Sequence, residues 1–335
     1  MRAAIYGLAG PDISAEEREF FRDADPAGFI LFKRNCETRD QVLRLTDALR
    51  TISGRAEVPI LIDQEGGRVA RMQPPAWPAF PSGDAFARLY RAAPSSAIEA
   101  ARSNARAIAL TLRSAGINVN CLPMLDVRQP GATDIVGDRA LGAEPMQVAA
   151  LGRAVLDGMS SAGVVGVIKH MPGHGRALVD SHKELPVVTA DEAELELDLE
   201  PFERLRGAPM GMTAHVVYTA WDPDRPASLS PTVIADVIRN RIGFDGFLMS
   251  DDIGMHALAG DFGSRAFGVV AAGCDAALHC SGDMAEMVAV AGAVPELSVE
   301  GEARLSRAMA SVLVDEEGPD FFEAAAKRDA LLAMV

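Results

Sequence analysis

The sequence has little cysteine, no excess of positive charge and no long hydrophobic run, and each lack excludes a class of protein. Its four cysteines show no metal-ligand spacing, so we expect small buried hydrophobes in a reducing compartment: Cys36, Cys121, Cys274 and Cys280. A formal net charge of −15 argues against nucleic acid or an anionic membrane surface as partner. No apolar run approaches the roughly 18 residues that span a membrane.

The sequence shows few signals of targeting segments or of domain boundaries. The apolar run before Asp12 is too short for a signal peptide, which favours a cytoplasmic protein. We find no internal repeat, low-complexity tract or linker, and we therefore expect one domain over residues 1–335. The proline-rich segment 74–81 predicts a long loop, and the region from Asp283 onward reads as helical.

Short apolar runs with the character of buried strands alternate with helical patterns along most of the chain. Capping boxes at Ser14, Thr38 and Thr189 and prolines at 145 and 231 predict helix starts. This alternation implies parallel strands and predicts an α/β fold, a (β/α)8 TIM-like barrel. An open doubly wound sheet is the alternative, but no GxGxxG follows an early strand. The eight predicted strands are Ala3–Leu8, Gly28–Phe32, Val58–Ile62, Ile117–Leu122, Val164–Ile168, Gly211–Ala214, Phe247–Met249 and Asp275–Leu278.

The segment KHMPGHGRALVDSH, residues 169–182, follows the fifth predicted strand and holds three of the six histidines. Pro172 and Gly173 exclude a regular helix, so the segment is expected to be a polar loop at a strand end. Without a helix, the spacing of four between His170 and His174 does not favour a zinc site.

Asp180 and His182 support a second interpretation of the same segment. Side chains two residues apart point the same way in an extended chain, so this carboxylate could orient the imidazole as in catalytic Asp–His pairs. The alternative is that these groups only satisfy one another in a turn. Their density beside glycines favours function.

Polar residues also follow the other predicted strands, where a barrel places its active site. Asp63 and Asp251 each close an apolar strand and are the strongest candidates, whereas Asp252 fits a structural cap. The further polar residues in these positions are Gln64, Glu65, Arg68, Arg71, Asp126, Asp138, Arg139, Lys169, His170 and His215.

Three motifs, IDQEGGRVAR (62–71), KHMPGHGRALVDSH (169–182) and GFDGFLMSDD (243–252), resemble those of family-3 glycoside hydrolases, in particular the single-domain bacterial β-N-acetylglucosaminidases of the NagZ type. GFILFKRN (28–35), PMLDV (123–127) and GDRALG (137–142) extend the resemblance to residues 28–280. It implies a (β/α)8 barrel, a retaining mechanism, no metal and no cofactor. It also implies release of terminal β-linked N-acetylglucosamine (GlcNAc), typically from muropeptides recycled in the cytoplasm.

The resemblance also implies roles for single residues. Asp251 matches the nucleophile, His182 the general acid/base and Asp180 its partner. The positions that match sugar-binding residues are Asp63, Arg71, Arg139, Lys169 and His170. Four features depart from the family pattern: Met171 for phenylalanine, Ala140-Leu141 for Ser-Phe, and His279 and Cys280 near a common asparagine.

The chemistry fits these residues, because retention needs an acid for the leaving oxygen and a carboxylate to trap the sugar. Lys169 or Arg139 could keep Asp251 ionised, and we expect the loop to swing His182 over bound sugar. A neutral imidazole also tolerates an anionic acceptor, so a phosphorylase stays an alternative, as does a chitooligosaccharide-directed hexosaminidase. Two other classes stay open: a metal-dependent hydrolase using His170, His174 and Asp180, and a silent sugar-binding protein.

Overall fold

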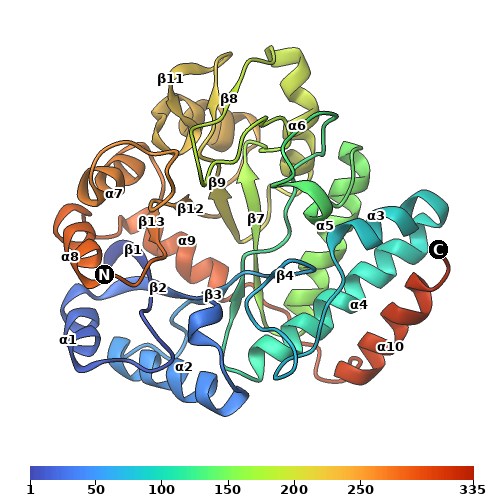
Figure 1. Ribbon diagram of the computed structural model, residues 1–335, viewed down its shortest axis with the longest axis horizontal. Coiled ribbons are helices and arrows are strands. Elements are labelled where there is room, and N and C mark those ends of the chain that lie inside the picture. Colours follow the sequence, from blue (N-terminus) through green and yellow to red (C-terminus); the bar gives the residue numbers. More distant parts are fainter.

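The computed structural model describes residues 1–335 and contains a closed barrel of eight parallel strands (Figure 1). The strands follow one another around the barrel in chain order, so the predicted fold class is confirmed. All eight predicted strands exist, with ends that differ by a few residues. They are β1 (Arg2–Gly7), β2 (Pro26–Leu31), β3 (Ile60–Ile62), β6 (Val119–Asn120), β7 (Val165–Met171), β9 (Met210–Thr213), β12 (Phe247–Asp252) and β13 (Ala276–His279).

Helices cover the outside of the barrel, and short helical turns join them to the strands. The α-helices are α1 (Ala15–Ala24), α2 (Arg39–Ser53), α3 (Gly83–Ala92), α4 (Pro94–Arg113), α5 (Pro145–Ser161), α6 (Glu192–Arg204), α7 (Phe262–Ala271), α8 (Met284–Ala293), α9 (Val299–Met309) and α10 (Phe321–Leu332). The other helical segments are η1 (Lys33–Asn35), η2 (Gly137–Arg139), η3 (Ala227–Leu229) and the π-helical η4 (Val233–Arg241). No helix is both long and apolar enough to cross a membrane.

Alternating side chains of the strands build two hydrophobic layers. Ile5, Val167 and Met249 point into the barrel, where α9 contributes Leu305 to close one end. Tyr6 and Ile168, from neighbouring positions, join the larger layer between barrel and helices. The four cysteines are buried and free, as expected from their scattered spacing.

The helix starts are set by the predicted caps, with one exception. Ser14 and Glu17 form the reciprocal capping box of α1, and the Thr38 hydroxyl accepts from the backbone of Gln41. The Thr189 prediction is wrong, because Asp191 with Glu194 caps α6. Thr189 directly follows β8, whose pairing holds the chain extended there.

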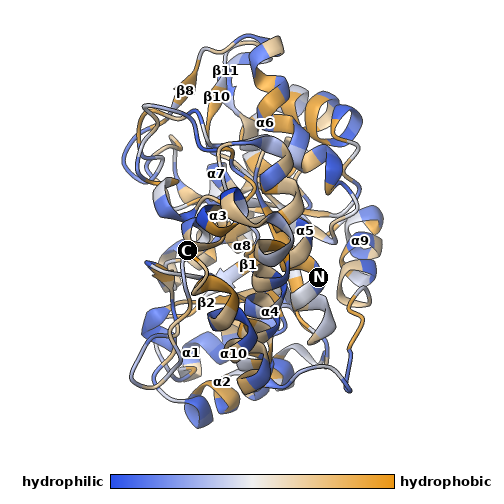
Figure 2. Cartoon of the chain, turned by 90° about the vertical axis from the view of Figure 1, so that its right-hand side faces the viewer, coloured by the Kyte–Doolittle hydropathy of each residue, from blue (hydrophilic) through white to orange (hydrophobic).

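Two small sheets were not predicted. A hairpin of β4 (Gln64–Gly66) and β5 (Val69–Ala70) follows β3 and precedes the expected loop 74–81. A second sheet joins β8 (Val187–Val188), β10 (Val217–Tyr218) and β11 (Asp222–Pro226). With α6 it projects from one end of the molecule (Figure 2).

Candidate active site

A cavity of about 230 Å³ opens at the carboxyl ends of the barrel strands. Ile30, Met212 and Leu278 from the barrel interior contribute to its apolar lining. Seven of the eight predicted site residues line it: Asp63, Arg71, Arg139, Lys169, His170, His182 and Asp251. Asp180 lies behind His182, to which it is hydrogen-bonded.

The cations and carboxylates at one side of this cavity form a continuous ion-pair network. Lys169 Nζ lies 3.0 Å from Asp63 Oδ1 and 2.7 Å from Glu65 Oε1. Arg139 donates to both carboxylate oxygens of Glu65, from Nε and Nη2, at 2.8 Å each. Arg71 Nη2 lies 2.9 Å from Asp63 Oδ2. The bidentate Arg139–Glu65 pair fixes the direction of its guanidinium group, and the other charge-assisted contacts hold Lys169 and Arg71 beside it.

This network keeps its members ionised despite their burial. Burial alone would raise the pKa of Glu65, but Arg139 and Lys169 overcome it and lower that pKa to about 2. The pKa of Asp63 is likewise held below its ordinary value, with Lys169 and Arg71 outweighing burial. Burial would lower the pKa of Lys169, but the two carboxylates raise it above its ordinary range. The pocket therefore presents charged donors and acceptors to a polar ligand.

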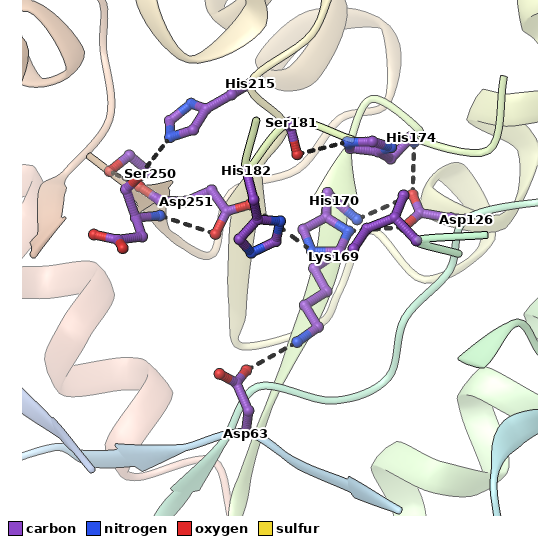
Figure 3. Close-up of polar contacts among 12 residues, drawn as sticks. Asp63, Asp126, Lys169, His170, His174, Ser181, His182, His215, Ser250 and Asp251 are labelled. Atoms are coloured by element: carbon purple, nitrogen blue, oxygen red, sulfur yellow. Dashed lines mark hydrogen bonds and ion pairs between the residues drawn. The ribbon is translucent and has the colours of Figure 1, made fainter. Parts of the chain in front are cut away.

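Asp251 is half-buried near the carboxyl end of β12 and faces a buried histidine. His170 Nε2 lies 4.0 Å from Asp251 Oδ2, while His170 Nδ1 lies 2.7 Å from Asp126 Oδ2 (Figure 3). Because burial alone would raise the pKa of Asp251, the net lowering comes chiefly from His170, with His215 and the backbone N–H of Asp252 adding to it. An ionised carboxylate in this position is suited to nucleophilic attack.

The expectation that Lys169 or Arg139 keeps Asp251 ionised is wrong. Both cations are already engaged by Asp63 and Glu65, and His170 takes that role instead. The sequence could not distinguish these donors, since all of them follow strands that end at the same side of the barrel.

The histidine and aspartate of the predicted dyad form a hydrogen-bonded pair. His182 Nδ1 and its backbone N–H both lie 2.9 Å from Asp180 Oδ1. The segment is a turn rather than the extended chain assumed in the prediction, because Asp180 O accepts from the backbone of Lys183 and Glu184. Burial alone would raise the pKa of Asp180, but His182 lowers it, so the carboxylate is charged.

The side chain of His182 is 61% exposed and already lines the cavity with Asp251. The predicted swing of this loop over bound sugar stays a prediction.

Two buried carboxylates of the site, Glu65 and Asp126, were predicted only as polar residues that follow strands, with no role assigned to them. Glu65 holds Lys169 and Arg139 together, and Asp126, fully buried, accepts from His170 Nδ1 and from the backbone of His170 and His174. Burial would raise the pKa of Asp126, but the two histidines lower it to about 2. Their place in the IDQEGG and PMLDV motifs was the available signal.

Arg68, His215 and Asp252 lie in or beside the site and are each held by other groups. Arg68 lines the cavity and pairs with Asp138 at 2.7 Å, whereas fully buried His215 bonds Ser228 Oγ and the carbonyl of Asp252. Asp252 caps a turn, since its Oδ1 accepts from Gly254 at 2.9 Å. Of the four departures from the family pattern only Cys280 lines the cavity.

The side chains do not form a metal site of the kind considered as an alternative. No group of three or more His, Cys, Asp and Glu side chains could hold a metal ion. His170, His174 and Asp180 are each engaged with a different partner: Asp126, Ser181 and His182.

Comparison with known proteins agrees with this geometry. The family described as "Glycosyl hydrolase family 3 N terminal domain" matches residues 2–314. The chain belongs to glycoside hydrolase family 3. The β-hexosaminidase of Alkalilimnicola ehrlichii is 37% identical over 316 residues, which cover 93% of this chain and 89% of that protein. That of Methylococcus capsulatus is 38% identical over 288 residues, 83% of this chain and 82% of that protein.

Solved structures of this family are also similar. NagZ from Neisseria gonorrhoeae superposes with a TM-score of 0.87 at 28% identity, over 99% of this chain and 98% of that chain. The same protein is known in complex with N-trifluoroacetyl-D-glucosamine. A β-N-acetylglucosaminidase from Paenibacillus sp. gives a TM-score of 0.80 at 30% identity, over 98% of this chain and 60% of that chain. The predicted enzyme class, a β-N-acetylhexosaminidase among the glycoside hydrolases, is thereby confirmed.

Proposed function

We propose that this family-3 β-N-acetylhexosaminidase is a retaining exo-β-N-acetylglucosaminidase that removes terminal β-linked GlcNAc. The observation that carries this proposal is that Asp251 and His182, from two different strand ends, line one small cavity (Figure 3). An ionised carboxylate and a titratable imidazole are the two groups that a double-displacement reaction needs.

In the first step His182 donates a proton to the glycosidic oxygen while Asp251 Oδ attacks the anomeric carbon. The bond to the aglycone breaks, and a glycosyl ester forms on Asp251. In the second step His182, now neutral, takes a proton from water, which attacks the anomeric carbon and releases the carboxylate. Asp180 accepts from His182 Nδ1 and thereby leaves Nε2 to carry the proton in both steps.

The ion-pair network supplies the sugar contacts of this proposal. Asp63 can accept from hydroxyl groups, while Lys169, Arg71 and Arg139 donate to hydroxyl or acetamido oxygens. A site built to hydrogen-bond particular hydroxyls rejects analogues that lack them, because its buried polar groups would be left unpaired. The N-acyl glucosamine bound by the gonococcal relative supports an N-acetylated sugar here.

The shape of the cavity supports exo action. Its inner lining includes barrel residues such as Ile30 and Met212, and its volume is about 230 Å³, so one terminal sugar can enter and no chain can pass through. By family resemblance, we propose a GlcNAc-anhydro-N-acetylmuramic acid muropeptide as the substrate, cleaved in the cytoplasm during cell-wall recycling.

The central test is hydrolysis of a chromogenic β-N-acetylglucosaminide by the wild type and by Asp251→Ala and His182→Ala. We expect both variants to lose at least about a hundredfold in turnover, as for loss of a general acid or base. Retention is read from the anomer first released, observed by proton NMR. Full activity in either variant, or first release of the α-anomer, would refute the mechanism.

Product analysis distinguishes the remaining alternatives. We expect GlcNAc as the product whether or not phosphate is present, and faster cleavage of muropeptide than of chitobiose. GlcNAc-1-phosphate would identify a phosphorylase, and a preference for chitobiose would identify a chitooligosaccharide hexosaminidase.

A further inference from the structure

The segment that carries the acid/base dyad, residues 178–185, is joined to the rest of the protein at one polar point. Within it, Ser181 is the only buried residue, with an exposed fraction of 2%, while the others are exposed or half-buried. Its Oγ lies 3.1 Å from His174 Nε2, and no other hydrogen bond or ion pair leads out of the segment. Figure 3 shows Ser181 pointing toward His174 rather than toward the pocket.

His174, the partner of Ser181, is itself fixed in place by burial and by a backbone hydrogen bond. Its ring is buried with an exposed fraction of 4%, and its backbone N–H donates to Asp126 Oδ1 at 2.7 Å. Its Nδ1 has no partner, so Ser181 makes the ring's single hydrogen bond. The same Asp126 carboxylate holds His170 against Asp251, which gives the two halves of the catalytic site one common support.

We propose that the His174–Ser181 hydrogen bond, a latch fixed by Asp126, positions His182 and Asp180 over the pocket. Ser181 lies between Asp180 and His182 in the chain. Its bonded hydroxyl therefore fixes the position of the turn that carries both residues. Ser181 and His174 are positioning residues, because neither lines the cavity. This inference rests on the proposed function, in which His182 acts as acid and base.

Loss of the latch has a specific kinetic signature. A mispositioned acid slows departure of a basic leaving group far more than that of an acidic phenol, which leaves without a proton. A mispositioned base slows attack by water but not by azide, which brings no proton to be removed. Azide attacks the anomeric carbon of the glycosyl-enzyme, releases the Asp251 carboxylate and yields a β-glycosyl azide.

The test compares Ser181→Ala with wild type on methylumbelliferyl and 2,4-dinitrophenyl β-N-acetylglucosaminides. We expect kcat/KM to fall at least about tenfold on the first, part of the hundredfold or more that a positioned acid contributes, and less than about twofold on the second. Turnover of the dinitrophenyl substrate falls too, and azide restores it with formation of the glycosyl azide.

Ser228→Ala is the matched control. Ser228 also bonds a buried histidine ring beside the nucleophile, His215 Nδ1 at 2.7 Å, but it has no link to the dyad segment. We expect this variant to change the rates on both substrates by the same factor, with no rescue by azide. Urea unfolding of both variants checks that each is folded at the assay temperature.

The outcomes separate the latch from general support of the fold. An equal loss on both substrates in Ser181→Ala, or no rescue by azide, would overturn the proposal. A double-mutant cycle with His174→Gln gives an independent check, because residues that share one bond show less than the product of the single losses. Independent, multiplicative losses would contradict the latch. A wild type inactive on every β-N-acetylglucosaminide would instead refute the proposed function.

Discussion

At the scale of single residues, Glu65 determines how the sugar-binding cations are arranged. Its side chain is 5% exposed and lies 2.8 Å from Arg139 and 2.7 Å from Lys169. A neutral residue at this position would therefore remove one carboxylate partner from each of these two cations. The sequence predicted the cations as ligands but not this support, because a motif names residue types and does not reveal which of them meet.

We therefore expect Glu65→Gln to raise KM at least about tenfold with a smaller effect on kcat. The unfolding free energy should fall by about 3 kcal/mol, since breaking a buried ion pair costs about 3–5 kcal/mol. Steady-state kinetics and urea unfolding measure both. Glu99→Gln is the control, because its partners Lys327 and Arg102 lie at the surface and such pairs contribute about 0–1 kcal/mol. Unchanged KM and stability in Glu65→Gln would show that the network is dispensable.

His174 gives the folded state a pH dependence of known sign. Burial lowers its pKa from 6.5 to about 4. Between these values the unfolded chain binds more protons at this ring than the folded chain does. The contribution of His174 to the unfolding free energy is therefore complete above pH 6.5 and is lost as the pH falls toward 4.

Urea unfolding of wild type and His174→Asn between pH 7 and 4.5 tests this. We expect the stability difference between them to shrink as the pH falls. Asp198 acts in the opposite direction, because burial raises its pKa to about 6, but both proteins retain it and its effect cancels. A difference that stays constant over this range would mean that His174 is not buried in a neutral form.

At the scale of elements, the loop after β7 depends on a close backbone approach. A Cβ at Gly175 would lie 1.9 Å from the carbonyl oxygen of Val127, far inside contact distance. The glycines of the GHG motif predicted an irregular loop, and this contact shows why one of them cannot be replaced.

Gly175→Ala should accordingly displace the loop that carries the dyad. We expect kcat/KM on methylumbelliferyl β-N-acetylglucosaminide to fall more than about tenfold, in keeping with the cost of misplacing catalytic groups by about 1 Å. Gly207→Ala is the control, since nothing lies within 4 Å of its added Cβ. Equal activity of the two variants would contradict the dependence of this loop on the close contact between Gly175 and Val127.

Elements with their own local signal were predicted, and those defined by distant partners were not. The strands of the barrel lie in short apolar runs that can be recognised in the sequence alone. β8 and β10 have two residues each and pair with each other across about 30 residues of chain, while β11 pairs with β10 alone. The shift of the α6 cap from Thr189 to Asp191 has the same origin, because that pairing keeps residue 188 extended.

At the scale of the whole molecule, a second buried ion-pair network lies at the end of the barrel opposite the catalytic cavity. Asp275 precedes β13 and pairs with Arg239 of η4 at 2.9 Å and Arg304 of α9 at 3.0 Å, and its side chain is 4% exposed. The order of the strands around the barrel could be predicted from the sequence, because alternating strands and helices admit few arrangements. The ion-pair network at the closed end could not be predicted, since its contacts join residues 36 and 29 positions apart in the chain.

We expect Asp275→Asn to lower the unfolding free energy by about 3 kcal/mol, because it removes the buried carboxylate that two half-buried guanidinium groups share, and only Arg304 keeps another carboxylate partner, Asp245. Below the unfolding temperature, kcat/KM should change less than about twofold, as the site lies at the other end of the strands. Urea unfolding and initial rates measure the two quantities. A large loss of activity at unchanged stability would link this end of the barrel to the chemistry.

The most direct measurement is to trap the sugar on the protein. A 5-fluoro-β-N-acetylglucosaminyl fluoride slows both steps and carries a leaving group that needs no acid, so a glycosyl-enzyme should accumulate. Peptide mass spectrometry after rapid acid quenching should place the added sugar on Asp251. Sugar on another residue, or efficient turnover with no covalent adduct at any time, would contradict nucleophilic catalysis by Asp251.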